Sequence, residues 1–526
     1  MNPRPTLPFV NPATGEQFGE VAMNTPAEVR QAVAEMRQAA VVWRQKPIQE
    51  RVRIIRQLQK VLIDATDEVT AVLNRDCGKT RQDALVEFFI TINLMDRYCR
   101  SAESWLRPRR VPSGIYYFKR CYVEQRPYGV VGIIGPWNYP VVLTGTPVIA
   151  ALLAGNTVVL KPSEVTAATN VLIEQLLNRV PELQPYVRVV HGDGSVGAAL
   201  VEAAPDLIFL TGSTPTGKKV MKAAADNLTP VICELGGKDP LIVLEDANVE
   251  EAARWGVWGA CFNAGQTCMA VERVYVVEKV YDAFVEAAVR EAQAFQMGCT
   301  ADKESPYSMG PLTFERQVHI VDDHLQDALA KGAKVLLGGR RDQMFMQPTV
   351  LVDVDHSMKV MREESFGPFL PIMKVKDEAE AIRLANDCAF GLSAYVWSED
   401  LTRAQRVASQ INAGTLVVND ALSHFAVTQL PFGGVKHTGN GRVHGQQDLL
   451  QFTQSHSYAV GRTPSPLDIA THLRKPGHYW LGAGIMRVLF GVTPEQRLQG
   501  VQELANGVKE RLPETPPSSA PATPSP

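Results

Sequence analysis

The sequence is poor in cysteine and nearly balanced in charge, and both features exclude classes of protein. Only 8 of its 526 residues are cysteine. They are irregularly spaced, with no close pair of the kind that ligates metals, so we expect reduced thiols, no disulfide framework and no metal site. The 53 basic and 56 acidic residues leave a net charge of −3. Without a polybasic segment, the chain does not have the signature of a nucleic-acid-binding protein.

Segments for export or for crossing a membrane are also missing from the sequence. The first thirty residues contain Pro3, Pro5, Pro8 and Pro12 and no apolar core of signal-peptide length, which predicts a cytoplasmic protein. An apolar stretch at 479–490 is only about a dozen residues long, which is too short to span a bilayer. We find no internal repeat.

The chain is large enough and apolar enough for more than one compact lobe. At 526 residues and 45% hydrophobic composition, at least two lobes are expected. Residues 26–108 are expected to be helical, because apolar positions recur at three and four residues in 27–42 and 51–73.

From Gly129 onward the pattern changes to short apolar runs, each followed by a turn and a helical stretch. The expected strands are 130–134, 157–160, 187–190 and 207–210, and then 240–244, 274–277, 394–396 and 415–418. This alternation is typical of βαβ units on parallel sheets buried on both faces, so the predicted fold is α/β with two Rossmann-like lobes. Residues 116–127, rich in aromatic and β-branched types, predict a β-hairpin arm that pairs between subunits.

Cys268 is the strongest candidate for chemistry. It ends the run Phe-Asn-Ala-Gly-Gln-Thr-Cys at 262–268. A packing cysteine normally has apolar neighbours, as Cys261 does beside Phe262, whereas a reactive cysteine needs polar neighbours and tight backbone. Glu234 and Asn138 lie upstream, and a thiol, a carboxylate and a side-chain amide are the groups that acyl chemistry needs.

These residues carry a family resemblance. The chain resembles the NAD(P)-dependent aldehyde dehydrogenases up to about residue 460, with an unusual C-terminal extension beyond it. The matching segments are 11–15, 136–140, 161–164, 211–217, 234–238, 265–268, 363–368 and 430–436.

The resemblance implies a role for each catalytic candidate. Cys268 would be the nucleophile, Asn138 the amide that stabilises the oxyanion, and Glu234 the base that activates water against a thioester. From the residues alone, an asparagine in a proline-flanked turn such as Asn138 is more often a helix cap, and the alternative for Glu234 is a solvated carboxylate at a strand end. Because members that pass the acyl group to coenzyme A often lack the glutamate, hydrolysis to a carboxylic acid is expected.

The cofactor site has one misleading motif. Residues 191–197 fit Gly-x-Gly-x-x-Gly, but they follow only one plausible strand and lack the acidic residue at the required strand end. The resemblance instead places the pyrophosphate at a helix opened by 212–217, where small residues and free N–H groups suit phosphate. The cofactor residues that it implies are Trp137, Lys161, Glu164, Gly212, Ser213, Gly217, Glu364 and Phe366. We expect NAD rather than NADP, because Glu164 would accept the ribose diol and repel a 2′-phosphate, although Lys161 would partly offset that repulsion.

The substrate tunnel is expected to be apolar and uncharged. The positions that would line it are Tyr139, Leu143, Thr146, Phe262, Thr267, Met269 and Phe425, the last in a loop at 422–426. No arginine stands among them to pair with an acid, so an aliphatic or aromatic aldehyde is favoured, and Thr146 suggests a wide tunnel. We expect His424, in the same loop, to be a surface group.

The expected organisation follows from these assignments. Residues 1–115 and 128–235 would bind NAD, 236–444 would form the catalytic domain, and 116–127 with 445–460 would form an oligomerisation arm. Residues 461–511 would be a helical extension, and 512–526, made of Pro, Ser, Thr and Ala with one Glu, a disordered tail. A homodimer or homotetramer is expected. Residues 480–511 would either pack within or between subunits, which we favour, or contact a membrane surface.

A protein of this family that had lost catalysis would be expected to lack Cys268, Glu234 or Asn138. All three are present. The sequence therefore favours an enzyme over a binding or structural protein.

Overall fold

The computed structural model describes residues 4–462 and 476–511, in two compact units. One unit comprises the chain up to residue 107 together with 125–455, and the other comprises 108–124 together with the chain from 456 onward. The predicted disordered tail at 512–526, and residues 463–475 of the predicted extension, lie outside the described residues.

The first unit begins with a small hairpin and four helices. The hairpin pairs β1 (Thr6–Val10) with β2 (Gln17–Ala22) in antiparallel register, and the sequence did not predict it. The helices are α1 (Pro26–Trp43), α2 (Ile48–Asp64), α3 (Thr66–Cys77) and α4 (Arg81–Leu106), which confirms the helical prediction for 26–108. Thr25 and Glu28 form a capping box that fixes where α1 begins.

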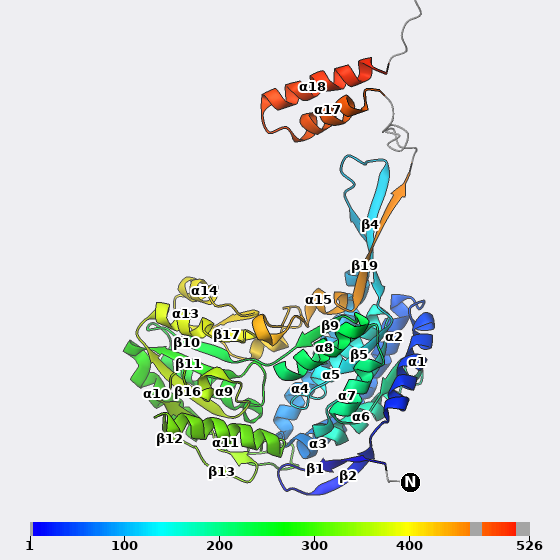
Figure 1. Cartoon of the computed structure of the whole chain (residues 1–526). Coiled ribbons are helices and arrows are strands. Elements are labelled where there is room, and N and C mark those ends of the chain that lie inside the picture. Colours follow the sequence, from blue (N-terminus) through cyan, green and yellow to red (C-terminus); the bar gives the residue numbers. More distant parts are fainter. Residues whose placement is uncertain (1–3, 463–475, 512–526) are drawn as a thin grey trace, which may run out of the picture. The chain divides into compact units, whose positions relative to one another are not determined.

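A five-stranded parallel sheet follows (Figure 1). Its strands are β5 (Val130–Ile134), β6 (Thr157–Lys161), β7 (Val187–Val189), β8 (Leu207–Thr211) and β9 (Val231–Glu234), in the order β7-β6-β5-β8-β9. The first four confirm predicted strands. Helices α5 (Val142–Ala154), α6 (Ala167–Asn178), α7 (Gly194–Glu202) and α8 (Thr214–Ala224) connect them.

Alternate side chains of this sheet pack on opposite faces, as the strand period requires. Val131 and Ile133 of β5 join a core with α2, α4 and α5, whereas Val130 packs with α1 and α7. Both faces are therefore covered, which explains why the strands read as continuous apolar runs.

The second sheet has seven strands in the order β12-β15-β16-β11-β10-β17-β18. These are β10 (Asp239–Val243), β11 (Val271–Val277), β12 (Lys334–Leu337), β15 (Thr349–Val352), β16 (Phe369–Val375), β17 (Ser393–Trp397) and β18 (Thr415–Val418). All its pairs are parallel except β12 with β15. Its helices are α9 (Val249–Cys261), α10 (Glu278–Gln293), α11 (Glu315–Ala330), α12 (Lys359–Arg362), α13 (Glu378–Asn386) and α14 (Leu401–Ala408). The two parallel sheets confirm the predicted fold class.

Short elements complete the first unit. They are the 3-10 turns η1 (Glu164–Thr166), η2 (Gln184–Tyr186), η3 (Ala225–Asn227), η4 (Phe262–Gly265), η5 (Ser423–Ala426) and η6 (Lys436–Thr438), the two-residue strands β13 (Arg341–Asp342) and β14 (Phe345–Met346), and α15 (Gly445–Leu450).

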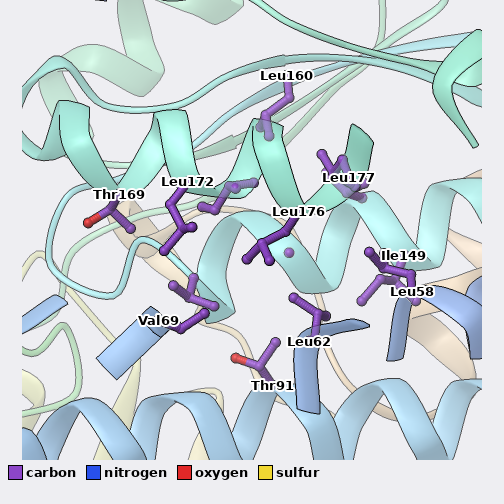
Figure 2. Close-up of a pocket in the computed structure, with 14 residues that line it drawn as sticks. Leu58, Leu62, Val69, Thr91, Ile149, Leu160, Thr169, Leu172, Leu176 and Leu177 are labelled. Atoms are coloured by element: carbon purple, nitrogen blue, oxygen red, sulfur yellow. The ribbon is translucent and has the colours of Figure 1, made fainter. Parts of the chain in front are cut away.

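A cavity of about 50 Å³ lies among α2, α3, α4, α5 and α6 (Figure 2). Its walls are apolar apart from two threonines, Thr91 and Thr169. A void of this size and lining is a packing defect rather than a substrate site. Gly145 of α5 borders it, and a Cβ placed on Gly145 would meet nothing closer than 3.7 Å.

The arm strands differ in their bounds from the prediction. β4 (Lys119–Pro127) pairs with the earlier β3 (Arg109–Val111) and with β19 (Thr453–Gly461) in a three-stranded sheet. The prediction of a hairpin at 116–127 is therefore wrong in its bounds, because Tyr116 lies in the turn, where its N–H bonds to Ser113. Aromatic composition marked the region but did not separate strand from turn.

The chain ends, within the described residues, in a helical hairpin. It consists of α17 (His478–Phe490) and α18 (Pro494–Lys509), which lie side by side (Figure 1). Among the helices that the structure describes, none is long and apolar enough to cross a membrane.

Candidate active site

The segment that carries Cys268 leaves α9 through an unusual turn. Asn263, Ala264 and Gly265 all have positive φ, at 53°, 55° and 74°. A Cβ on Gly265 would lie 2.2 Å from the carbonyl oxygen of Gly367, so only glycine fits there. Three consecutive residues in this region are costly, and such strain is typical of functional turns. The turn leaves Cys268 half-buried just before β11.

Asn138 reaches the same segment from the other sheet. It follows β5, and its Nδ2 donates to the carbonyl oxygen of Gln266 at 3.1 Å. Asn263 holds the pair together, since its Nδ2 donates to the carbonyl oxygens of both Asn138 and Gln266 at 3.3 Å. The amide of Asn138 is therefore buried and fixed in place by a bond to Gln266, which lies two residues before Cys268.

Tyr139 and Thr267 form a second link between these two segments. The Tyr139 hydroxyl and Thr267 Oγ1 are 2.7 Å apart. Lys79 Nζ lies 3.9 Å from the centre of the Tyr139 ring, which is a cation–π distance, and is itself paired with Glu87. Glu87 also accepts the backbone N–H groups of Val141 and Val142 at the start of α5. The ion pair thus holds both the tyrosine and the helix that follows it.

Glu234 ends β9 and is buried rather than solvated, with 7% of its surface exposed. Its Oε1 has no hydrogen-bond partner among the described residues. Glycines make room for it: a Cβ on Gly433 would lie 2.9 Å from that oxygen, and one on Gly441 would lie 2.3 Å from it. A buried carboxylate with a free oxygen can bind and deprotonate a water molecule.

The charges around Glu234 act in opposite directions. Burial raises the pKa of Glu234 well above its usual value, the Arg442 guanidinium opposes that rise, and the Asp448 carboxylate adds to it. Burial also brings the pKa of Asp448 itself to about 6. Such a glutamate is poised to exchange a proton at higher pH than a solvated one.

The surroundings of Cys268 favour the protonated form of its thiol. Burial raises its pKa, and the carboxylates of Glu364, Asp239 and Glu234 raise it further. The same influence shows that these groups and Cys268 lie close enough to interact. Cys268 therefore becomes a nucleophilic thiolate only when a base removes its proton or a positive charge offsets the nearby carboxylates.

The start of α8 has the features of a phosphate site. Ser213 caps it by accepting from the Thr216 N–H, and Pro215 lies in the first turn, as predicted. A Cβ on Gly212 would meet no protein atom closer than 3.7 Å, so packing does not explain that glycine, whereas Gly217 packs against Leu235. An open glycine before a helix N-terminus fits a pyrophosphate. In contrast, Asp193 caps α7 with its own carboxylate, at the motif that the sequence analysis set aside.

The residues assigned to the two riboses lie at the ends of other elements. Lys161 ends β6, and its Nζ lies 2.8 Å from Glu164 Oε2. Glu364 accepts the Gly237 N–H at 2.9 Å, and burial raises its pKa to about 8. Phe366 packs edge-on against Trp137, with ring centres 5.5 Å apart.

A buried ion pair supports this last group. Lys238 Nζ lies 2.5 Å from Glu272, whose carboxylate accepts the backbone N–H groups of Ser365 and Phe366 at 2.8 and 2.9 Å. Glu272 therefore sets the position of the segment that contains Glu364. The residues present fit a dinucleotide.

Two of the aromatic side chains assigned to the tunnel, Phe262 and Phe425, contact other aromatic rings. Phe262 stacks on Tyr139 with ring centres 6.5 Å apart, and Phe425 meets Phe432 edge-on at 4.9 Å. Leu143 and Met269 pack against the same apolar cluster as Phe425. Thr146 is buried, and its hydroxyl bonds back to the Val142 carbonyl, so its effect on tunnel width stays a prediction.

The prediction that His424 is a surface group is wrong. It is buried and bonds through Nε2 to Ser393 Oγ at 3.2 Å, because η5 turns its side chain inward. His444 is buried beside it, and no described residue bonds to either of its ring nitrogens. Burial lowers the pKa of His424 to about 4 and that of His444 to about 3, so both are neutral.

Comparison with known proteins agrees with this geometry. The sequence profile of the aldehyde dehydrogenase family matches residues 2–458. The chain belongs to the aldehyde dehydrogenase family. NAD(P) is the cofactor of this family, and its members oxidise aldehydes to acids.

Individual relatives cover most of the chain. The 4,4'-diapolycopene aldehyde oxidase of a Methylomonas species is 41% identical over 88% of this chain and 87% of its own. A putative NADP-dependent succinate-semialdehyde dehydrogenase of Mycolicibacterium smegmatis is 36% identical over 88% of this chain and 90% of its own. The solved structure of a putative aldehyde dehydrogenase, PutA, from Anabaena variabilis superposes with a TM-score of 0.83, at 33% identity, over 88% of this chain and 99% of that one.

This aldehyde dehydrogenase also has functional candidates that the sequence analysis missed. They are Lys79 and Glu87 beside Tyr139, Glu272 beneath Glu364, and Arg442 with Asp448 around Glu234. Each is a charged residue remote in sequence from the group it serves. The apolar periodicity of α4 marks position 87 as buried. The charge of Glu87 at that position was the one signal in the sequence that pointed to such a residue.

Proposed function

We propose that this enzyme oxidises apolar aldehydes to carboxylic acids with NAD, through Cys268, and releases the acid by hydrolysis. The observation that carries the proposal is that Asn138 bonds to Gln266, two residues before Cys268, while Glu234 is buried with one carboxylate oxygen that has no partner among the described residues. Residues 1–115 and 128–235 are assigned to cofactor binding and 236–444 to catalysis.

The residues divide the chemistry into two halves. The Cys268 thiol gives up its proton to solvent water, and the resulting thiolate adds to the aldehyde carbon. The Asn138 amide with the Cys268 N–H stabilises the oxygen that becomes negative. A bound NAD would supply the acceptor for the hydride that this carbon loses. Glu234 then takes a proton from the water that attacks the thioester, and the acid leaves as the thiol is restored.

The preference for NAD rests on Glu164. Its carboxylate suits the ribose diol and disfavours a 2′-phosphate, although Lys161 at 2.8 Å partly neutralises it. Relatives named as NADP-dependent make the comparison of the two cofactors necessary.

The substrate class rests on the side chains assigned to the tunnel, none of which is charged. The 41% identical relative is named for a diapolycopene aldehyde, which supports a long apolar substrate. The relatives named for succinate semialdehyde are less similar, and a carboxylate-bearing substrate would need a cation that the assigned lining lacks.

A homo-oligomer is proposed through the arm. Beside the stacked rings of Tyr122 and Tyr458, the arm sheet bears a groove of about 410 Å³, and Tyr117 is largely exposed. Light scattering that finds a dimer or tetramer supports this assignment, and a monomer at micromolar concentration contradicts it.

One kinetic experiment tests the proposed function. Decanal, retinal, benzaldehyde and succinic semialdehyde are each assayed with NAD and with NADP, using wild type and Cys268→Ala. We expect the highest kcat/KM with decanal or retinal and NAD, and none with Cys268→Ala, although that variant still binds NAD. Residual turnover above a few per cent in Cys268→Ala, or a preference for succinic semialdehyde, would contradict it.

A further inference from the structure

The helical hairpin of α17 and α18 is built with its small residues inside. Gly484, Gly500 and Gly507 are buried between the helices. A Cβ on Gly484 would lie 2.7 Å from the carbonyl oxygen of Gly500, and one on Gly507 would lie 2.8 Å from the backbone nitrogen of Leu481. The two backbones are therefore in direct contact, and nothing larger than glycine fits at these points.

An ion pair of the hairpin is inside as well. Arg487 pairs with Glu503, whose side chain is 8% exposed. A charge pair at a helix interface is unusual for a small hairpin in water, which normally buries its largest apolar side chains there.

The large apolar side chains face outward instead. On α17, Tyr479, Met486, Leu489 and Phe490 are 75%, 53%, 48% and 70% exposed. Their spacing of three and four residues places them on one face, opposite the face that carries Gly484. On α18, the exposed Leu498, Val501 and Val508 form a second apolar stripe.

This arrangement indicates what surrounds the hairpin. Close backbone packing on glycine, with bulky apolar residues outside, is characteristic of helices in lipid, where apolar surface need not be hidden. The α17 sequence contains no acidic residue, and its one basic residue, Arg487, is the internally paired one. Trp480 and Tyr479 stand at the start of α17, where amphipathic rings favour the lipid–water boundary.

The dimensions decide how the hairpin would lie. A helix of 13 residues, such as α17, is about 20 Å long, and the hydrocarbon core is about 30 Å thick. The hairpin therefore cannot cross a bilayer but can lie in its surface. We infer that α17 and α18 dock this enzyme on a lipid bilayer surface through the outward face of α17.

The chemistry of binding follows from composition. Residues 476–511 contain four basic and three acidic side chains, so attraction to anionic lipid is weak and binding is driven by apolar burial. The inference stands on the hairpin alone and does not depend on which aldehyde the enzyme oxidises.

Vesicle flotation of the full-length enzyme tests this inference. Phosphatidylcholine vesicles are used without substrate, and the test variant combines Met486→Gln, Leu489→Gln and Phe490→Gln. A matched control combines Leu228→Gln, Leu329→Gln and Leu401→Gln, which replace leucines of the first unit that are 90%, 40% and 58% exposed.

We expect the wild type and the control to float with vesicles, and the bound fraction of the hairpin variant to fall at least fivefold. Binding should be unchanged in 0.5 M NaCl, since it is not electrostatic. NAD reduction with a short soluble aldehyde should be equal in all three proteins, which shows that the first unit is intact.

Other outcomes would overturn the inference. Failure of the wild type to float with the vesicles would refute membrane docking. If the hairpin variant then also formed a smaller oligomer than the wild type, the hairpin would be identified as an interface between copies. Equal loss in the hairpin and control variants would show that flotation reports general surface hydrophobicity. Each of these results leaves the proposed aldehyde oxidation untouched, because flotation is measured without substrate.

Discussion

Replacing each of the two charged neighbours of Glu234, Arg442 and Asp448, with an uncharged amide should move the pH dependence of turnover in opposite directions. As the proposed base, Glu234 would act only when it is deprotonated, so we expect turnover to be lost as the pH falls through its raised pKa. Arg442→Gln removes a positive charge that lowers this pKa, and the profile should move to higher pH. Asp448→Asn removes a negative charge that raises it, and the profile should move to lower pH.

The size of the effect follows from how closely these groups are packed. A Cβ on Gly433 would lie 2.9 Å from Glu234 Oε1 and 3.1 Å from Arg442 Cδ, so both side chains share one small space. A unit charge at about 7 Å, with an effective dielectric constant of about 20, contributes about 2 kcal/mol. This corresponds to a shift of about one to two pH units in the midpoint for Arg442→Gln. The shift for Asp448→Asn should be smaller, because Asp448 influences the pKa of Glu234 less than Arg442 does.

The assay separates the two halves of the reaction. A rapid burst of NADH reports acylation of Cys268, and the steady rate that follows reports hydrolysis of the thioester. Glu234→Gln should keep the burst and slow the steady rate at every pH. This variant is the control that lacks the proposed base. Arg442→Gln and Asp448→Asn are measured from pH 6 to 10 beside the wild type. Midpoints that move in the same direction, or that do not move, would refute the assignment of Glu234 as the base under the control of these two charges.

Further variants test three other parts of the structure. Glu164→Ser should narrow the ratio of kcat/KM for NAD over NADP, and a wild type that already prefers NADP would contradict the role of the carboxylate. Thr267→Val removes the 2.7 Å bond to Tyr139 and, at a net value of about 1 kcal/mol, should lower kcat/KM about fivefold. Tyr139→Phe should do the same, and a double variant with the product of both losses would show that the bond is not what matters. Gly145→Ala lies within a helix and beside a cavity, with Thr91 3.7 Å away, so it should stabilise the fold by about 1 kcal/mol in urea unfolding, and a lower midpoint would contradict this.

The sequence predicted the parts of the fold that depend on local periodicity. Buried parallel strands such as β5 and β8 read as apolar runs because both of their faces are covered. The strands that were missed carry weaker signals. The β1 strand lies before the first helix, α1, and pairs only with β2 in an isolated hairpin. The β16 strand begins after a turn that contains Pro368. Neither strand therefore shows the regular alternation of strand and helix that marked the others.

The catalytic candidates were predicted from motifs, whereas their environment was not. Cys268, Asn138 and Glu234 each sit in a short recognisable segment. That Glu234 is buried, with a free oxygen, depends on Gly433 and Gly441, which are about two hundred residues away in the chain, and no local pattern reports such a distance. The same reason explains His424, whose loop looks solvent-exposed until η5 is seen to turn inward.

The C-terminal extension shows how the same residues support different interpretations at the two levels. In the sequence, large apolar residues at helical spacing favour a packed helix, because such side chains usually fill an interface. In the structure, Gly484, Gly500 and Gly507 occupy the interface between α17 and α18. The side of each helix opposite its glycines must then point away from the partner helix. The bulky residues are therefore outside because the glycines are inside. Apolar periodicity predicts that a helix has a face to bury, but the small residues decide which face meets its partner helix and which is left for another surface.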